Sequence, residues 1–235
     1  MLDLPRHETG TGTCLAYDFN QFAFVHNANM LGAAALARTA KHTGNPTYSS
    51  VAHSATEYSC TRQNADGAWY YGEKSMYHWI DNFHTGYNLD SLKRYIRYTG
   101  ESRWNETLSK GLAYFKNHFI EEDGCPRYYH DRRQPIDIQG AAQIIDTLAF
   151  FSEEDPSCLD LSMKVARWTI ENMQDRDGHF YYRRYPAIVA KTPMLHWGQA
   201  TMFKALAQLS AKLQAAASGD RRSGNRDLDV PRTAA

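Results

Sequence analysis

The stretch Gln63–Asp90, QNADGAWYYGEKSMYHWIDNFHTGYNLD, contains the pattern around which the chain is organised. It begins with an Asp-Gly turn, continues through an aromatic loop and ends with the polar start of a helix. The same order recurs twice downstream, with Asp-Gly pairs at Asp66-Gly67, Asp123-Gly124 and Asp177-Gly178. Their intervals of 57 and 54 residues predict an array of similar supersecondary units. Glycine suits a turn and the preceding aspartate supports it, so we expect these pairs to be structural.

Helix starts recur at a similar interval. An aliphatic residue precedes a polar one at each start, and the pairs are Val25-His26, Ile80-Asp81, Ile136-Asp137 and Leu195-His196. Together with the apolar periodicity, these starts predict helices at about 20–43, 46–64, 79–98, 102–119, 136–152, 156–173 and 196–216. Alternate helices share the polar start, so we expect helical hairpins with an inner and an outer row.

The chain divides into three segments. We expect residues 1–19 to be irregular and residues 20–217 to form the helical hairpins. Residues 218–235 have little apolar surface to bury and are expected to be disordered. This division predicts an all-α fold of about seven helices.

Composition narrows the class of protein. The chain contains 26 basic and 26 acidic residues, which argues against a nucleic-acid groove or a polybasic membrane surface. No stretch reaches a transmembrane length and no signal core is present, so we expect a cytoplasmic protein without membrane insertion. The four cysteines have no close spacing and are expected to be free thiols. The 15 Tyr, 10 Phe and 5 Trp offer flat surfaces for sugar rings or isoprenoid chains.

The Asp-Gly turns also resemble a known repeat. QNADGAW at 63–69 matches the QxxDGxW repeat of squalene and hopene cyclases, QDRDGHF at 174–180 is a second copy, and EEDGCP at 121–126 keeps only the turn. The chain thus resembles the α/α-toroid superfamily, which includes triterpene cyclases and protein prenyltransferase β subunits. Carbohydrate-active six-hairpin toroids, such as uronyl hydrolases and sugar 2-epimerases, share this architecture. The cyclase DxDD motif and the prenyltransferase Asp-x-Cys zinc pattern are missing, so the resemblance does not extend to their chemistry.

Longer motifs resemble a bacterial family of toroid proteins associated with exopolysaccharide biosynthesis. The resemblance spans about residues 17–210 and rests on FVHNANMLGAAALAR, WYYGEKSMYHWIDNFHTGYNLDSLKRY, YYHDRRQPIDIQGAAQIIDTLAFF and KTPMLHWGQATMFKAL. Members are loosely labelled prenyltransferase-like, squalene-cyclase-like or delta-aminolevulinic acid dehydratase. The last label implies a β/α barrel with a Schiff-base lysine, which nothing here resembles. Members are longer at the N-terminus, so the chain resembles their C-terminal part and is expected to form a partial α/α toroid.

Polar residues at the helix starts are the candidate catalytic residues. Asp81 and His84 stand at i and i+3 and can share a helix face, where the carboxylate would orient the imidazole as a general acid or base. Asp81 and Asp137 occupy equivalent repeat positions and could act as acid and base on a glycosidic bond. His26 and His196 could instead flank a sugar and move a proton. The competing interpretation of the aspartates is helix capping, because Asp is a good N-cap residue.

The remaining candidates are substrate-binding residues. The helix starts contribute Asn27, Asn29, Gln139, Trp197 and Gln199, and the loops and the third helix contribute Trp69, Tyr71, Lys74, Tyr87, Tyr129, Arg132 and Arg133. Aromatic rings could stack on a substrate, while cations and the free N–H groups of helix N-termini could hold an anion. The competing interpretations are hairpin packing for the aromatic residues and solvated loop charge for the cations.

These features predict a protein of exopolysaccharide metabolism that acts on or binds an anionic, uronic-type saccharide, as a lyase, glycoside hydrolase or epimerase. No cofactor is expected, and no metal site, because no ligand spacing supports zinc. The alternatives are isoprenoid processing, for which no Asp-rich Mg²⁺ motif is present, and a non-catalytic saccharide-binding or scaffold module. A partial toroid exposes apolar helix faces, so we also expect self-association or a partner chain on its open edge.

Overall fold

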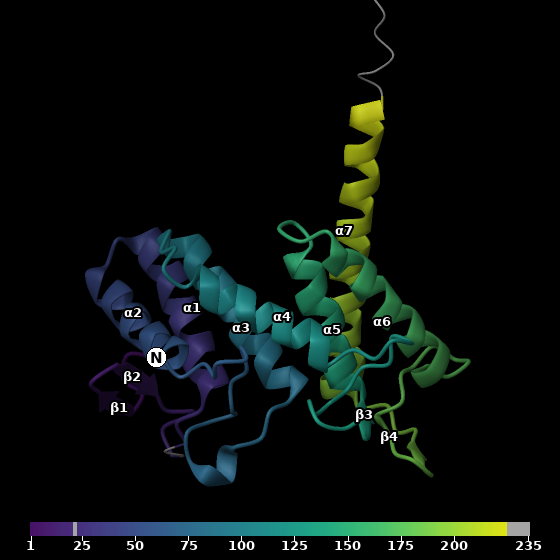
Figure 1. The fold of residues 1–235 in the computed structure, drawn as a ribbon, viewed down its shortest axis with the longest axis horizontal. Helices are drawn as coiled ribbons and strands as arrows, with labels where there is room; N and C mark the ends of the chain where they lie inside the picture. The colour runs from purple at the N-terminus through teal and green to yellow at the C-terminus, as the bar shows by residue number, and fades with distance from the viewer. Residues whose placement is uncertain (21–22, 225–235) are drawn as a thin grey trace, which may run out of the picture.

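Seven α-helices account for most of the described chain. The structure is a computed structural model that describes residues 1–20 and 23–224 (Figure 1). The α-helices in these residues are α1 His26–Thr43, α2 Pro46–Cys60, α3 Asn82–Thr99, α4 Asn105–His118, α5 Ile138–Phe151, α6 Ser157–Met173 and α7 Thr201–Gly224. A π-helical turn, Leu195–Ala200, leads into α7, and a short 3₁₀ helix, Ser75–Tyr77, lies in the first aromatic loop. The predicted helical fold is confirmed, although several helices begin a few residues later than expected.

The helices form two layers. α1, α3, α5 and α7 pack side by side in chain order as an inner row, and α2, α4 and α6 cover this row from outside. Small residues allow the inner helices to approach closely. A Cβ atom at Gly86 of α3 would lie 2.7 Å from Cγ of Gln143 in α5, so only glycine fits there. The upper half of α7 projects beyond the other elements (Figure 1).

The Asp-Gly turns are structural, as predicted. The φ angles of Gly67, Gly124 and Gly178 are +96°, +91° and +96°, in the left-handed region that favours glycine. In each turn the aspartate Oδ1 accepts the N–H group two residues further on, at 3.0 to 3.1 Å. In the first turn Gln63 also donates to the Gly67 carbonyl at 2.9 Å. The QxxDGxW pattern therefore closes a turn after an outer helix.

Replacing Gly67 by alanine should destabilise the protein more than replacing Gly178. The two glycines have the same φ angle, so either alanine would be strained by about 1–2 kcal/mol. A Cβ at position 67 would also collide with the Lys110 carbonyl of α4, whereas a Cβ at position 178 meets nothing within 4 Å. Such overpacking costs about 1–3 kcal/mol more. Urea unfolding measures the difference, and equal losses in the two variants would refute it.

Each aromatic loop is tied to the inner helix of the preceding hairpin. The first helical N–H groups of α1, α3 and α5 donate to the carbonyls of Tyr71, Tyr128 and Tyr182 at 3.0, 2.9 and 3.1 Å. Beside the third tie, β3 (Ile136–Asp137) pairs with β4 (Arg183–Arg184), which pairs with β5 (Val189–Ala190). These hydrogen bonds hold the aromatic loops against the N-terminal turns of α1, α3 and α5. Both lie on one side of the molecule, at the bottom of Figure 1, and the loops are 68–81, 125–137 and 179–195. We call this side the head surface.

Two segments differ from the prediction. Residues 1–19 are not irregular throughout, because β1 (Arg6–Thr9) and β2 (Gly12–Leu15) form an antiparallel hairpin that packs on α2. Its turn glycine, Gly12, has a φ angle of +103° but no preceding aspartate, so the repeat pattern does not reveal it. Residues 218–224 continue α7 as helix, and the rest of the predicted disordered tail, 225–235, lies outside the described residues. None of the described helices has the length and apolar character needed to cross a membrane.

Candidate functional site

Asp81 both caps α3 and binds the side chain of His84. Its Oδ1 accepts a hydrogen bond from the backbone N–H of His84 at 2.8 Å. Its Oδ2 accepts hydrogen bonds from Nδ1 of His84 at 2.7 Å and from Nε1 of Trp79 at 2.9 Å. The structure therefore brings the predicted Asp81–His84 pair together. Asp81 can cap the helix and bind the imidazole at the same time, because Oδ1 accepts the backbone N–H and Oδ2 accepts the imidazole N–H.

His84 is the member of this pair that reaches the surface. Its side chain is 20% exposed, whereas that of Asp81 is 1% exposed. A carboxylate only accepts hydrogen bonds, so Nδ1 of neutral His84 carries the proton and Nε2 presents a lone pair. Within residues 1–20 and 23–224, Nε2 has no hydrogen-bond partner. This arrangement orients the imidazole as a general base.

A stack of aromatic rings flanks His84. The ring of Tyr71 lies 4.4 Å from the imidazole, and Trp79 stacks on Tyr71 at 4.6 Å with an interplanar angle of 16°. Burial is the main cause that raises the pKa of Tyr71, and the charge of Asp81 contributes to the rise. The Tyr71 hydroxyl therefore keeps its proton at neutral pH and can act as a donor.

Asp137 caps α5 and is held by Arg183. Its Oδ1 accepts the N–H groups of Gln139 and Gly140 at 2.9 and 3.4 Å, and its Oδ2 accepts Nε and Nη2 of Arg183 at 2.8 and 2.6 Å. Its side chain is only 3% exposed. A carboxylate bound in this way cannot act on a glycosidic bond unless Arg183 first releases it.

Tyr128 is close to both aspartates. Burial, followed by the negative charges of Asp81 and Asp137, raises the pKa of Tyr128 well above its usual value. The guanidinium of Arg183 lies 5.8 Å from the centre of its ring. The Tyr128 hydroxyl is thus a second neutral donor on the head surface.

His26 and His196 lie in different surroundings. His26 is 1% exposed, and both ring nitrogens are occupied: Nε2 lies 2.8 Å from Glu73 and Nδ1 lies 3.1 Å from Ser59. The hydrogen bond with His26 lowers the pKa of Glu73. His196 is exposed and stacks on Trp197 at 4.6 Å, with no contact to His26 in the described part of the chain. The ring nitrogens of His26 are thus already bonded within the chain, and a shared proton-transfer role for these two histidines stays a prediction.

Four predicted substrate-binding residues already form hydrogen bonds within the chain. Their polar atoms are occupied by distant parts of the chain, which a sequence pattern does not reveal. The partners are the Ala55 carbonyl for Asn29, the Ser59 carbonyl for Trp69, the Phe180 backbone for Gln199 and the Asp123 carboxylate for Arg133, at 2.6 to 2.9 Å. Trp69 is also only 2% exposed, so a substrate cannot reach it.

Two predicted cations lie at the surface of the aromatic loops. Lys74 is exposed and makes no ion pair among the residues that the structure describes. Arg132 is exposed, lies 4.4 Å from the Tyr129 ring and is 3.5 Å from Asp131. Both cations are therefore accessible to an anionic ligand.

Three of the remaining side chains are buried or half-buried near the helix starts. Oδ1 of Asn27 and Nε2 of Gln139 are buried and have no hydrogen-bond partner among the described residues. Such groups are commonly satisfied by water or by a ligand. Tyr87 packs edge-on against Phe83 at 4.6 Å. The binding roles of these three residues stay predictions.

Sequence reasoning missed Trp79, Tyr128, Glu73 and Arg183. Trp79 and Tyr128 lie in the aromatic loops, next to predicted residues. Glu73 and Arg183 bind helix-start residues that precede them by 47 and 46 residues. These intervals are nearly equal, but no short-range motif links either pair.

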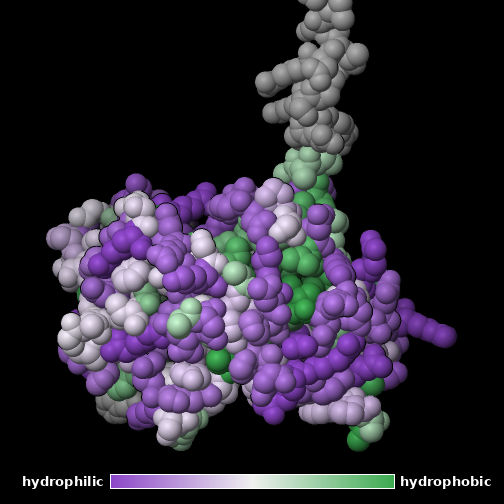
Figure 2. Space-filling model, viewed as in Figure 1, coloured by the Kyte–Doolittle hydropathy of each residue, from purple (hydrophilic) through white to green (hydrophobic). Residues whose placement is uncertain are grey.

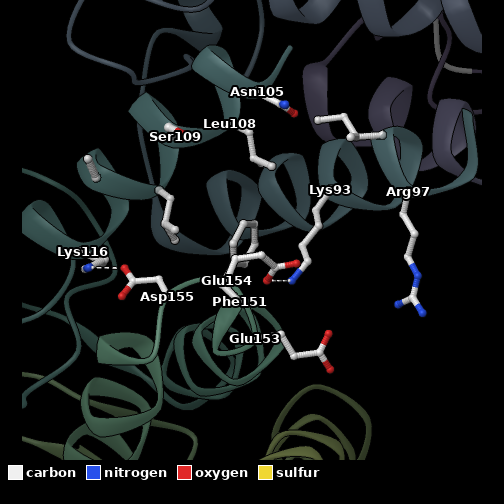
Figure 3. A pocket seen from close by; sticks show the side chains of 13 residues that line it. Lys93, Arg97, Asn105, Leu108, Ser109, Lys116, Phe151, Glu153, Glu154 and Asp155 are labelled. Atoms are coloured by element: carbon white, nitrogen blue, oxygen red, sulfur yellow. Dashed lines mark hydrogen bonds and ion pairs between the residues drawn. The ribbon is translucent and has the colours of Figure 1, made fainter. Parts of the chain in front are cut away.

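A hollow of about 880 Å³ lies toward the C-terminal ends of α3 and α5, away from the head surface, and Figure 3 shows its lining. α3, α4 and the corner after α5 line it. Two of its three cations are already paired, with Lys93 at 2.5 Å from Glu154 and Lys116 at 2.7 Å from Asp155, while Arg97 makes no ion pair with the described residues. No group of three or more His, Cys, Asp or Glu side chains suited to a metal occurs in the described residues, here or elsewhere. The unpaired His84 Nε2 makes the head surface the stronger candidate.

Asp90 should make the stability of the protein depend on pH. Burial raises the pKa of this carboxyl from 3.8 to about 7, with Arg94 and Lys204 lowering it and Asp146 raising it. The folded state therefore binds more protons than the unfolded state between these pKa values, so stability should fall as the pH rises through this window. Asp90→Asn should remove most of this fall, at most about 4 kcal/mol. Urea unfolding on both sides of the window measures it, and an unchanged slope would exclude Asp90 as the cause.

Comparison with protein-family models and with curated protein sequences finds no match to this chain. Among solved structures, the Lin0763 protein from Listeria innocua is similar with a TM-score of 0.71 at 14% identity, over 91% of this chain and 63% of that one. An unsaturated glucuronyl hydrolase from Bacillus sp. GL1 has a TM-score of 0.64 at 17% identity, over 79% and 58%. Cellobiose 2-epimerase from Bacillus thermoamylovorans has a TM-score of 0.63 at 12% identity, over 87% and 64%.

At these identities the similarity concerns the fold alone. The chain spans less than two thirds of the length of each of these proteins. The alternation of inner and outer helices seen here agrees with the similarity. The chain therefore has the α/α-toroid fold that its resemblance to that superfamily implies.

Proposed function

We propose that the protein acts on an anionic, uronic-type saccharide by acid–base chemistry at the head surface. His84 is the general base, and Asp81 is the residue that positions it. The observation that carries this proposal is the buried Asp81 carboxylate, which holds Nδ1 of His84 at 2.7 Å and leaves Nε2 free beside the Tyr71–Trp79 stack. Glucuronyl hydrolases and a polysaccharide lyase share the fold, which supports a saccharide as the substrate class.

The surroundings of His84 suit a sugar acid. The stacked rings of Tyr71 and Trp79 match the flat face of a sugar ring. The N-terminal turns of α1, α3 and α5 place partial positive charge on the same side of the molecule. Lys74 and Arg132 add accessible cations that can bind a carboxylate.

The geometry favours proton abstraction followed by elimination. His84 takes the proton from the carbon beside the substrate carboxylate, and the electrons of that C–H bond form a C=C bond as the glycosidic C–O bond breaks. The departing oxygen takes a proton from the Tyr71 hydroxyl, whose raised pKa keeps it protonated beforehand. An epimerase would use the same first step and return a proton to the opposite face. A hydrolase acting through Asp81 and Asp137 is disfavoured, because both carboxylates are fully bonded.

The cellular context is part of the proposal. A role in exopolysaccharide metabolism rests on the family that the long motifs resemble. A cytoplasmic location is supported by the four cysteines, all of them free and buried, which suit a reducing compartment.

Thermal melting with sugar acids tests the proposal. Digalacturonate at about 100 times its Kd should raise the melting temperature by roughly 5–10 °C, because it binds only the folded state. The neutral disaccharide cellobiose should give no shift. Ultraviolet absorbance of an unsaturated uronate would then report elimination. An equal shift with cellobiose would refute the anionic preference, and a shift only with polyprenyl phosphate would favour isoprenoid processing. Binding without turnover of any uronic oligosaccharide would favour a saccharide-binding module.

A further inference from the structure

Among the glycines of the β1–β2 turn and the three Asp-Gly turns, three pack against an outer helix and Gly178 does not. A Cβ atom at Gly12, Gly67 or Gly124 would collide with a backbone carbonyl of an outer helix. The helices concerned are α2, α4 and α6, through Ser54, Lys110 and Lys164. The fourth turn glycine, Gly178, has the same kind of backbone, with a φ angle of +96°, but its Cβ would meet no described atom within 4 Å. The place of an outer helix is therefore open beside Gly178.

A hollow of about 430 Å³ occupies this place. Its lining is mostly apolar and consists of Gly178, Phe180, Gln199, Phe203, Leu206 and Ala207. Phe203 is 77% exposed, although it stands in the middle of this apolar lining. Figure 2 shows that hydrophobic surface continues along α7 on the face in view. Since three equivalent turns each hold a helix, an α-helix is the occupant that fits this groove.

The projecting half of α7 exposes its side chains over residues 214–218. Gln214, Ala215 and Ala216 are all exposed, and three consecutive residues point to nearly all sides of a helix. This half stands clear of the other elements in Figure 1. Its small side chains permit the close approach that the turn glycines make to the other outer helices. The chain thus carries both an open helix groove and an unpacked helix.

We propose that two copies of this chain associate through α7, with the projecting half of each α7 lying antiparallel in the Gly178–Phe203 groove of the other. The same patch is used on both copies, so the interface is two-fold symmetric and closes as a dimer. α7 is about 36 Å long, enough for both grooves to be filled at once. Phe203 would cover the alanine-rich segment around Ala215, and the two helices would cross near Ser210. This proposal does not depend on the proposed function.

Light scattering during size-exclusion chromatography tests the dimer. The wild-type chain should elute with the mass of two copies, and Phe203→Glu should elute with the mass of one. Met76→Glu is the matched control, because Met76 is 70% exposed but lies in the 3₁₀ helix of the first aromatic loop. It should remain dimeric. A monomeric wild-type chain, or a dimer that persists in Phe203→Glu, would overturn the proposal.

A cross-link tests the geometry without disturbing the groove. The four natural cysteines are buried, so they do not compete on the surface. Ser210→Cys should form a disulfide between two copies under mild oxidation, because the symmetry axis passes near this position. Met76→Cys should stay unlinked. Equal cross-linking of the two variants, or none at position 210 in a dimeric protein, would rule out antiparallel pairing through α7. Far-ultraviolet circular dichroism confirms that each variant is folded.

Discussion

Replacing His84 by alanine should lower kcat for a uronic-type substrate by about 10²- to 10⁴-fold, which is the contribution of a positioned general base. KM should change little, because the Tyr71–Trp79 stack and the surface cations remain. The α3 cap should also survive, since Oδ1 of Asp81 binds the backbone N–H at position 84 rather than the imidazole. Steady-state kinetics on the sugar acid that raises the melting temperature measures the effect.

Two further variants separate catalysis from structure. His78 lies in the aromatic loop that precedes α3, stacks on Tyr70 at 4.3 Å and contacts the Glu73 carbonyl at 3.0 Å, so His78→Ala should retain turnover. Asp81→Asn should lower kcat and also shift the pH profile, because an amide cannot fix the tautomer of His84 in the same way. Full activity in His84→Ala would remove the proposed base. Equal losses in the variants at positions 78 and 84 would indicate damage to the loop rather than to the chemistry.

The fold could be predicted because its main devices are local in sequence. The turn at Asp66-Gly67 is closed by a hydrogen bond that spans two residues, and the same turn appears at Asp177-Gly178. Such short-range chemistry is visible in a residue pattern. The β1–β2 hairpin could not be predicted from the Asp-Gly pattern, because its turn has a glycine, Gly12, but no preceding aspartate.

The candidate site could be predicted only where its contacts are also local. Asp81 and His84 are one helical turn apart, so the pair follows from spacing. Arg183 reaches Asp137 only because the third loop folds back onto the head of α5. Trp69 looked like a stacking residue, but an indole N–H suits a buried carbonyl equally well, and the Ser59 carbonyl takes it. Residue type alone does not distinguish these two uses.

Replacing Arg183 by methionine should destabilise the protein by about 3 kcal/mol, because it leaves Asp137 as a buried charge without a partner. The side chains of Arg183 and Asp137 are 25% and 3% exposed, so solvent can replace the lost ion pair only in part. Urea unfolding provides the measurement. Arg132→Met is the matched control: Arg132 is 59% exposed and faces an equally exposed Asp131, so the loss should stay below about 1 kcal/mol.

A double variant shows whether charge is the cause. Asp137→Asn keeps an N-cap acceptor for α5 and removes the buried charge, so adding it to Arg183→Met should restore most of the lost stability. If the double variant were as unstable as Arg183→Met alone, the loss would come from the pairing of β3 with β4 and not from the ion pair. Recovery would instead mean that Arg183 compensates a charge at the head of α5. That charge would then be expendable for folding.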